Sequence, residues 1–489
     1  MATLRFRTSA AAALVLLIAA GCGDARPNAS WPTANGDASS RRSITETSID
    51  AKTVSHLRVR WRYRLRTKAS AFGAVTANPV IAGDTVYVQD SSSSVYALDA
   101  ETGALRWKHR FAAHNDGPNG VAVSGSRVYG ATDTTAFALS ASTGRLLWTR
   151  RLVDRFELFV AIAPVVDRRR VYLSTQGFPP GGRGALYALS AARGTVVWRF
   201  ETIRGPWPHP QAGGGGAWYP LSVDASGNVY AGIANPAPWG GSKAFPDGGW
   251  FGRALYTDSL VVLAGASGRL LWFDQVTRHD VRDYDFAVSP ILAAVDGRRA
   301  VFGAGKAGRV VAWDRATHTR LWARAVGTHR RDLGPLPATP ATVCPGLLGG
   351  VLTPMAYAHG RLFVPVVELC SRESATTSND AFLRPPAQGR GTLYALDAAT
   401  GRTSWRRRLG SPPFACATVA RDAVIVPTYD GNVRAFAAAD GRLLWRARLR
   451  AGNNSCPAVG KDVLIVAGGA PHPRIAHPVA EVVAYGLPR

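Results

Sequence analysis

The sequence lacks the features that mark several large protein classes. Its 489 residues include five cysteines, and no Cys-x-x-Cys pair or Cys/His cluster indicates a zinc site. A Cys-x-x-Cys-His segment, the attachment site of a c-type haem, is also absent. Helical periodicity is scarce, whereas 51 glycines and 31 prolines are typical of a turn-rich protein. These observations favour a large all-β domain.

Acidic residues are few, with 33 Asp and Glu against 58 Lys and Arg, so the net charge is +25. Such an excess suits nucleic acid or an anionic membrane surface. However, many arginines fall in strand-like segments such as "WTRRL", "WRRRL" and "WRYRL". Charge on the outer strand of a sheet prevents edge-to-edge pairing, which explains this placement without a ligand. No nucleic-acid-binding motif is present. We therefore predict no nucleic-acid partner and, at most, a weak attraction to anionic lipid.

The N-terminus predicts export. "MATLRFR" precedes the apolar run "AAALVLLIAAG", which is too short to span a bilayer. The small residues before Cys22 resemble a bacterial lipobox, in which this cysteine carries the lipid; an ordinary secretory signal with a chance cysteine is the alternative. We expect a lipoprotein signal peptide at 1–21 and a flexible, polar tether at 22–56. The protein would be held in the cell envelope, on the outer side of the cytoplasmic membrane or in the periplasm.

Export changes how the other cysteines are interpreted, because disulfides persist in oxidising compartments. Cys416 and Cys456 occupy the same position in two successive repeats, "FACATVARD" and "NSCPAVGKD". A bridge between them would leave Cys344 to pair with Cys370. Free buried thiols are the alternative.

An internal repeat decides the fold. Its pattern is Ala-x-Asp-x-x-Thr-Gly-x-x-x-Trp, as in "YALDAETGALRW". With some erosion it recurs in segments that end at Trp107, Trp148, Trp198, Trp272, Trp322, Trp405 and Trp445. Alternating apolar residues on each side of the turn predict two strands, and two more short strands lie upstream of each motif.

Each repeat is therefore a four-stranded antiparallel sheet, the unit of a β-propeller. Seven blades are complete in the sequence. The eighth combines three C-terminal strands, in "SCPAVGKDVLIVAGGA" and "EVVAYGLPR", with the N-terminal strand "LRVRWRYRL". We predict an all-β, eight-bladed propeller over 57–489, closed by strands from both ends of the chain.

The repeat resembles the tryptophan-docking motif of pyrroloquinoline quinone (PQQ) propellers over about residues 57 to 489. Non-catalytic lipoproteins of outer-membrane assembly share this motif, so it predicts the fold more than the activity. Four further elements resemble quinoprotein alcohol and sugar dehydrogenases: a glycine run before a Trp, "NPAP", "HDVRDYD" and "GKAG". The run Gly213–Gly216 is expected to be flexible backbone and not a phosphate site, because no strand-to-helix switch follows it.

The resemblance implies a role for one residue in each element. Trp218 would lie against the PQQ ring system, and Lys306 would bond the quinone oxygens. Asn235 would ligate calcium, a hard cation that prefers oxygen. Asp283 would be the general base and a neighbour of the metal.

Apart from the resemblance, His279 and Asp280 are expected to brace the loop and not to touch substrate. Structural roles are the alternative for the other residues: Trp218 would fill the central core, Asn235 would hold a turn, Asp283 would pair with Arg282 or Arg278, and Lys306 would be a solvated loop cation.

The sequence departs from this family pattern at two places. The glutamate that ligates calcium should precede the third docking motif, but "STQGFPPGGRGALYAL" contains no acid. Arg282 stands where the family has a Trp, and we expect this arginine to lower the pKa of Asp283.

Two functions remain open. The first is a PQQ- and calcium-dependent dehydrogenase that oxidises an alcohol or a sugar and needs a separate electron acceptor. The second is a cofactor-free lipoprotein scaffold with a protein partner on its propeller face. The loops Gly327–Val351 and Cys370–Gly391 are predicted to cap one face.

Overall fold

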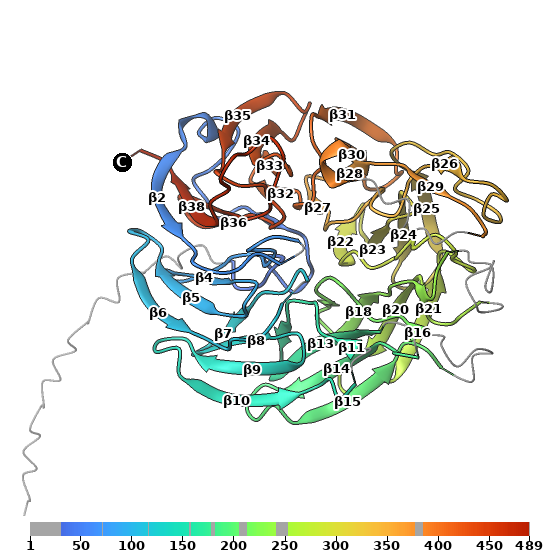
Figure 1. Cartoon of the computed structure of the whole chain (residues 1–489), viewed down its shortest axis with the longest axis horizontal. Helices are drawn as coiled ribbons and strands as arrows, with labels where there is room; N and C mark the ends of the chain where they lie inside the picture. Colours follow the sequence, from blue (N-terminus) through green and yellow to red (C-terminus); the bar gives the residue numbers. More distant parts are fainter. Residues whose placement is uncertain are drawn as a thin grey trace, which may run out of the picture.

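The computed structural model describes residues 31–70, 72–115, 117–155, 158–177, 181–204, 213–240, 253–376 and 385–488. Within these ranges the chain forms eight sheets arranged around a common centre (Figure 1). The main strands of each sheet pair antiparallel, and they run in order from the centre to the rim. The predicted eight-bladed propeller is confirmed.

The first four blades have these strands, listed from the centre outward: β3 (Val80–Ala82), β4 (Thr85–Gln89), β5 (Val95–Asp99) and β6 (Leu105–His109); β7 (Ala122–Ser124), β8 (Arg127–Ala131), β9 (Thr135–Ser140) and β10 (Leu146–Arg151); β12 (Val165–Asp167), β13 (Arg170–Gly177), β14 (Ala185–Ser190) and β15 (Val196–Glu201), with β11 (Leu158–Phe159) also on β13; β17 (Ser222–Val223), β18 (Asn228–Gly232), β20 (Ser259–Ala264) and β21 (Leu270–Gln275).

The other four blades follow the same order: β22 (Ile291–Val295), β23 (Arg298–Gly305), β24 (Arg309–Asp314) and β25 (Arg320–Ala325); β27 (Ala356–Ala358), β28 (Arg361–Glu368), β30 (Arg390–Asp397) and β31 (Thr403–Leu409); β32 (Thr418–Ala420), β33 (Ala423–Pro427), β34 (Asn432–Ala437) and β35 (Leu443–Arg448); β36 (Ala458–Val459), β37 (Val463–Gly468), β38 (Glu481–Gly486) and β2 (Arg58–Arg64). The last blade joins β2 to β38, as predicted.

Two small sheets and two 3-10 helices lie in the connections. One sheet pairs β16 (Gly213–Gly214) with β19 (Pro236–Ala237), and the other pairs β26 (Ala341–Val343) with β29 (Ser371–Glu373). The helices are η1 (Val54–His56) and η3 (Pro386–Gln388). No helix among the described residues has the length and apolar character needed to cross a membrane.

The repeat tryptophans join neighbouring blades. The indole of Trp61 donates a hydrogen bond of 3.0 Å to the Ala100 carbonyl, in the turn of the next blade. Gly103 of that turn has a φ of +73°, and a Cβ there would lie 2.6 Å from the Trp61 ring. Only glycine allows this contact, which explains the Thr-Gly of the motif. Equivalent indole-to-carbonyl bonds start from Trp107, Trp148, Trp198, Trp322 and Trp405.

Both predicted disulfides are present. Cys416 is bonded to Cys456, and Cys344 is bonded to Cys370. Cys416 lies just before β32 and Cys456 just before β36, so the first bond connects the innermost strands of blades 7 and 8.

The expected tether at 22–56 is wrong for residues 31–56, which belong to the folded domain. Trp31 and Ile49 are buried in the core, and β1 (Ser43–Ile44) pairs in parallel with β32. The polar composition misled the prediction because this segment is held mainly by backbone bonds. They link residues 31–48 to Ile81, Val123, Val223, Leu292, Tyr357, Val419, Arg421 and Lys461, in seven of the eight blades.

Arg42 anchors this N-terminal segment at the centre of the ring. Its guanidinium is fully buried and donates five hydrogen bonds, of 2.6–3.1 Å. The acceptors are the carbonyls of Ala34, Ala417 and Pro457 and the side chains of Asn35 and Thr418. All five donors are therefore satisfied without a carboxylate. Residues 22–30, with Cys22, lie outside the described residues.

Candidate functional site

The predicted site residues lie at one end of the ring, in the connections of blades 4 and 5. Trp218 precedes β17, and Asp283 precedes β22, the innermost strands of blades 4 and 5. Asn235 follows β18 and Lys306 follows β23, the second strands of the same two blades. Because neighbouring strands are antiparallel, the start of a first strand and the end of a second strand meet at the same end of the blade. The N-terminal segment instead bonds to backbone groups within the inner strands themselves.

The centre of the site is a lysine between two carboxylates. Nζ of Lys306 lies 2.7 Å from Oδ2 of Asp283 and 2.6 Å from Oδ2 of Asp285. Burial would lower the pKa of Lys306, but the charges of Asp283 and Asp285 outweigh burial and raise it. The structure thus brings together the two residues predicted to be base and cofactor ligand.

Asn235 joins this cluster through its backbone. Its N–H donates to Oδ1 of Asp285 at 3.0 Å, and its side-chain amide donates to the Pro236 carbonyl. The glycine run keeps this backbone in place: Gly214 has a φ of +95°, and a Cβ there would lie 2.5 Å from the Asn235 carbonyl oxygen. The run is therefore packed, in contrast to the flexible backbone expected for it.

Trp218 precedes Tyr219 in the connection that leads into β17. Its ring contacts Phe159, with centroids 5.4 Å apart and a tilt of 57°. Its indole N–H is buried and has no hydrogen-bond partner among the described residues. Burial raises the pKa of the neighbouring Tyr219, which also feels the charges of Lys306 and Asp285.

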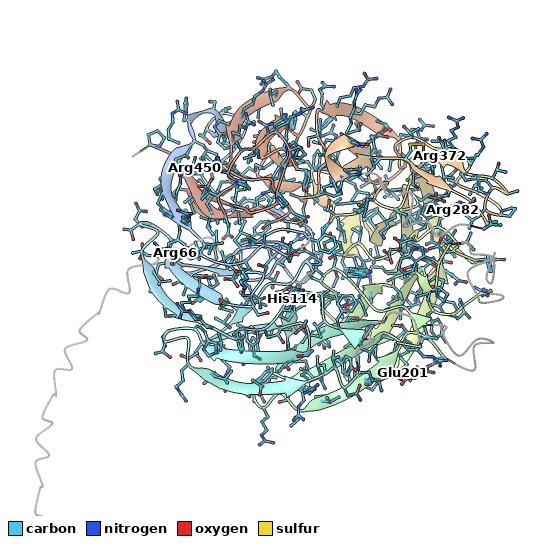
Figure 2. The ribbon with its side chains drawn as sticks, viewed as in Figure 1. Arg66, His114, Glu201, Arg282, Arg372 and Arg450 are labelled. Carbon is cyan, nitrogen blue, oxygen red and sulfur yellow. A yellow bond between two sulfur atoms is a disulfide. The ribbon has the colours of Figure 1, made fainter. Side chains whose placement is uncertain are left out.

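Arg282 does not act on Asp283 as expected, and this prediction is wrong. Its guanidinium is buried and donates to the carbonyls of Gly334 and Pro335, at 2.8 and 2.9 Å. The pKa of Asp283 is raised well above its usual value because burial disfavours its charge, with a smaller opposing effect of Lys306. Arg282, labelled in Figure 2, instead connects the site to the 327–351 loop through these two hydrogen bonds.

Asp280 braces the turn that carries the catalytic candidate, as expected. Its carboxylate accepts the backbone N–H groups of Arg282 and Tyr284. Burial raises the pKa of Asp280 to about 6, although these two hydrogen bonds work in the opposite direction. Asp283 itself has a φ of +61°, a conformation that such a braced turn can impose.

Sequence reasoning missed two buried acids. Asp258, before β20, is fully buried, and neither carboxylate oxygen has a hydrogen-bond partner among the described residues. Glu373, in β29, is also fully buried; Oε1 accepts from Ser371, while Oε2 faces Nε of Arg282 at 3.9 Å. The only available signal for Asp258 was an acid directly before the apolar strand "SLVVLA".

The charges gathered here suit a cation. A single ammonium group, that of Lys306, contacts the carboxylates of Asp283 and Asp285. Its charge also acts on Asp258 and Asp280. In the described part of the chain, however, no three acidic, histidine or cysteine side chains converge into a ready-made metal site. Lys306 now lies where a cation would contact Asp283 and Asp285.

Two family models match most of the chain. One, described as outer membrane protein assembly factor BamB, matches residues 112–339 and 345–473. The other, described as the β-propeller domain of glucose/ethanol/alcohol dehydrogenase, matches residues 31–151. The second match includes the N-terminal segment that packs into the ring.

Curated relatives are alcohol dehydrogenases, some of them named as quinohemoproteins. Quinohemoprotein alcohol dehydrogenase ADH-IIG of Pseudomonas putida is 28% identical over 312 residues, which are 57% of this chain and 43% of that protein. Polyvinylalcohol dehydrogenase of a Pseudomonas species is 24% identical over 431 residues, 79% of this chain and 62% of that protein. The chain thus spans under two thirds of the length of either relative.

Solved structures share the fold. The structure of ADH-IIG from Pseudomonas putida superimposes with a TM-score of 0.82 at 23% identity, covering 94% of this chain and 80% of that one. A europium-containing methanol dehydrogenase gives 0.79 at 20% identity, covering 94% and 98%. BamB from Moraxella catarrhalis gives 0.56 at 14% identity, covering 88% and 99%.

Proposed function

Because the chain belongs to the PQQ β-propeller repeat family, related to quinoprotein alcohol dehydrogenases, we propose that it is an exported, PQQ-dependent dehydrogenase. Its substrate would be an alcohol or a sugar, and calcium would assist the reaction. The observation that carries this proposal is the Asp283–Lys306–Asp285 cluster, with Asn235 bonded to Asp285 at the same end of the ring.

The residues present fit a cation and a flat quinone. Four buried carboxyl groups interact with one ammonium group, and oxygen donors suit calcium. The indole N–H of Trp218 has no hydrogen-bond partner among the described residues, and the next residue, Tyr219, feels the charges of Lys306 and Asp285. Trp218 and Lys306 would hold PQQ, and Asn235 with Asp283 would hold calcium. The ammonium of Lys306 would have to move off the carboxylates to make room.

When bound, PQQ would accept the hydride from the carbinol carbon, and calcium would act as the Lewis acid. A side chain of the protein would remove the proton from the substrate hydroxyl. A carboxylate with a raised pKa is a stronger base toward a hydroxyl proton. Burial raises the pKa of Asp283, and Lys306 fixes the position of its Oδ2. A separate acceptor would reoxidise the reduced cofactor, as expected from the sequence.

Dye-linked activity tests the proposal. The exported domain, loaded with PQQ and calcium, should reduce an artificial acceptor in the presence of an alcohol or a sugar. Asp283→Asn should lower kcat by about 100- to 10,000-fold, the usual contribution of a general base. Asp440→Asn, in an exposed turn far along the chain from the site, is the control and should leave kcat unchanged. Full activity in Asp283→Asn would contradict the assignment of the base.

A cofactor-free scaffold is the second candidate. Two observations favour it: the larger matched model is described as an assembly factor, and Lys306 already neutralises Asp283 and Asp285. The protein partner would then bind the propeller face. A lack of PQQ and calcium uptake would support this alternative.

A further inference from the structure

We propose that Asp258 supplies a carboxylate ligand for the cation. The family pattern places this ligand before the third docking motif, where this chain has no acid. This inference rests on the proposed function. The expected glutamate is missing from 174–189, so a cation bound only by Asn235 and Asp283 would lack one carboxylate. Asp258 lies in the same connection of blade 4 as Asn235, between β18 and β20.

The backbone fixes Asp258 next to Asn235. The N–H of Asp258 donates to the Ala234 carbonyl at 3.1 Å, and its own carbonyl accepts from Val276 at 2.9 Å. These bonds hold the residue from both sides, with a φ of +51°. Asp258 is therefore a positioned group and not a loose loop acid.

The side chain has no partner that would explain its burial. It is 0% exposed, and neither carboxylate oxygen accepts a hydrogen bond among the described residues. An ionised carboxylate in such surroundings costs several kcal/mol unless a proton or a cation compensates it. The charged groups that act on it are Asp280, Asp285, Asp283 and Lys306, the members of the site itself.

Glu373 provides a matched comparison. It is also a fully buried acid with one oxygen that accepts no hydrogen bond, and it also feels the charge of Asp280. Its other neighbours are Ser371 and Arg282, so it has a cationic partner of its own. A comparison of Asp258→Asn with Glu373→Gln therefore separates the effect of losing a ligand from the effect of losing a buried charge.

Calcium titration tests the inference without any turnover. Calcium binding to the exported domain is measured by calorimetry, and the melting temperature is measured with and without calcium. Asp258→Asn should weaken calcium binding at least tenfold and remove the calcium-induced rise in melting temperature. The calcium-free variant should melt higher than the calcium-free wild type, because an uncompensated buried carboxylate is gone. This second readout also shows that the variant folds.

The outcomes separate the two proposals. Glu373→Gln should bind calcium within about twofold of the wild type, whereas Asp283→Asn should lose binding. If Asp258→Asn binds calcium like the wild type while Asp283→Asn does not, Asp258 is no ligand and the proposed function stands. If the wild type itself takes up no calcium, both the inference and the calcium-assisted function are wrong.

Discussion

At the scale of single residues, the site is an arrangement of buried charges that compensate one another unequally. Lys306 is shared by Asp283 and Asp285, Asp280 is satisfied by backbone N–H groups, and Asp258 is left without a partner. A protein that only needed stability would gain from replacing such a group by an apolar one. Such unequal compensation is what the proposed cation site requires.

Glu373 gives a prediction for pH. Burial raises its pKa from 4.5 to about 7, so the folded state binds the proton more tightly than the unfolded state. The contribution of protonated Glu373 to the free energy of unfolding is fully present below the unfolded pKa of 4.5, and it is lost as the pH rises through about 7. Glu373→Gln should therefore stabilise the protein by about 3 kcal/mol at pH 8 and have little effect at pH 4. Urea unfolding at both pH values measures this; an equal effect at both would contradict the burial of a charge.

The sequence predicted some of these residues and not others. Asp283 and Lys306 were found because "HDVRDYD" and "GKAG" are local motifs. The partners of Arg282 were not, because Gly334 and Pro335 are backbone acceptors more than 50 residues away in a loop without periodicity. Asp258 looks like an ordinary turn residue in sequence, since only the fold shows that its carboxylate is buried.

At the scale of elements, the N-terminal segment is the main departure from expectation. Its composition is that of a linker, and side-chain periodicity carries no information on the backbone bonds that hold it. Those bonds reach the innermost strands of six blades, namely β3, β7, β17, β22, β27 and β32. The segment therefore ties the blades together from the centre, while the docking tryptophans tie them at the rim.

Arg42 is the residue through which this segment can be tested. Arg42→Lys retains the charge but has three donors for five acceptors, so buried carbonyls lose their partners. We expect a loss of about 2–6 kcal/mol in the free energy of unfolding, since two buried acceptors lose their partners and each costs about 1–3 kcal/mol. Arg41→Lys, at an exposed ion pair with Asp37, is the matched control and should change stability by less than about 0.5 kcal/mol. Equal effects of the two substitutions would show that the segment is not held through Arg42.

At the scale of the whole molecule, the ring closes through three independent contacts. β2 pairs with β38, the indole of Trp445 donates to the Leu57 carbonyl, and Cys416 is bonded to Cys456. The repeat alone predicted the number of blades and the split blade, because each motif marks one sheet. The closed ring brings the loops of blades 4 and 5 together at one end of the propeller.

The disulfide between blades 7 and 8 should contribute measurably to this closure. Cys416 and Cys456 are 40 residues apart, and a loop of that size corresponds to about 4 kcal/mol in the chain-entropy model. The double variant Cys416→Ala, Cys456→Ala should lose about 2–4 kcal/mol in urea unfolding. An unchanged midpoint would mean that the strand pairing and the tryptophans close the ring without it.

The central claim is that the site around Asp283 and Lys306 holds a quinone, and PQQ uptake tests it most directly. The exported domain is mixed with PQQ and calcium and passed over a gel-filtration column, with absorbance recorded for quinone and protein. We predict that the quinone co-elutes with the wild-type protein and that Trp218→Ala weakens this binding about tenfold. Quinone that elutes entirely apart from the folded wild-type protein, at excess PQQ and calcium, would contradict the claim.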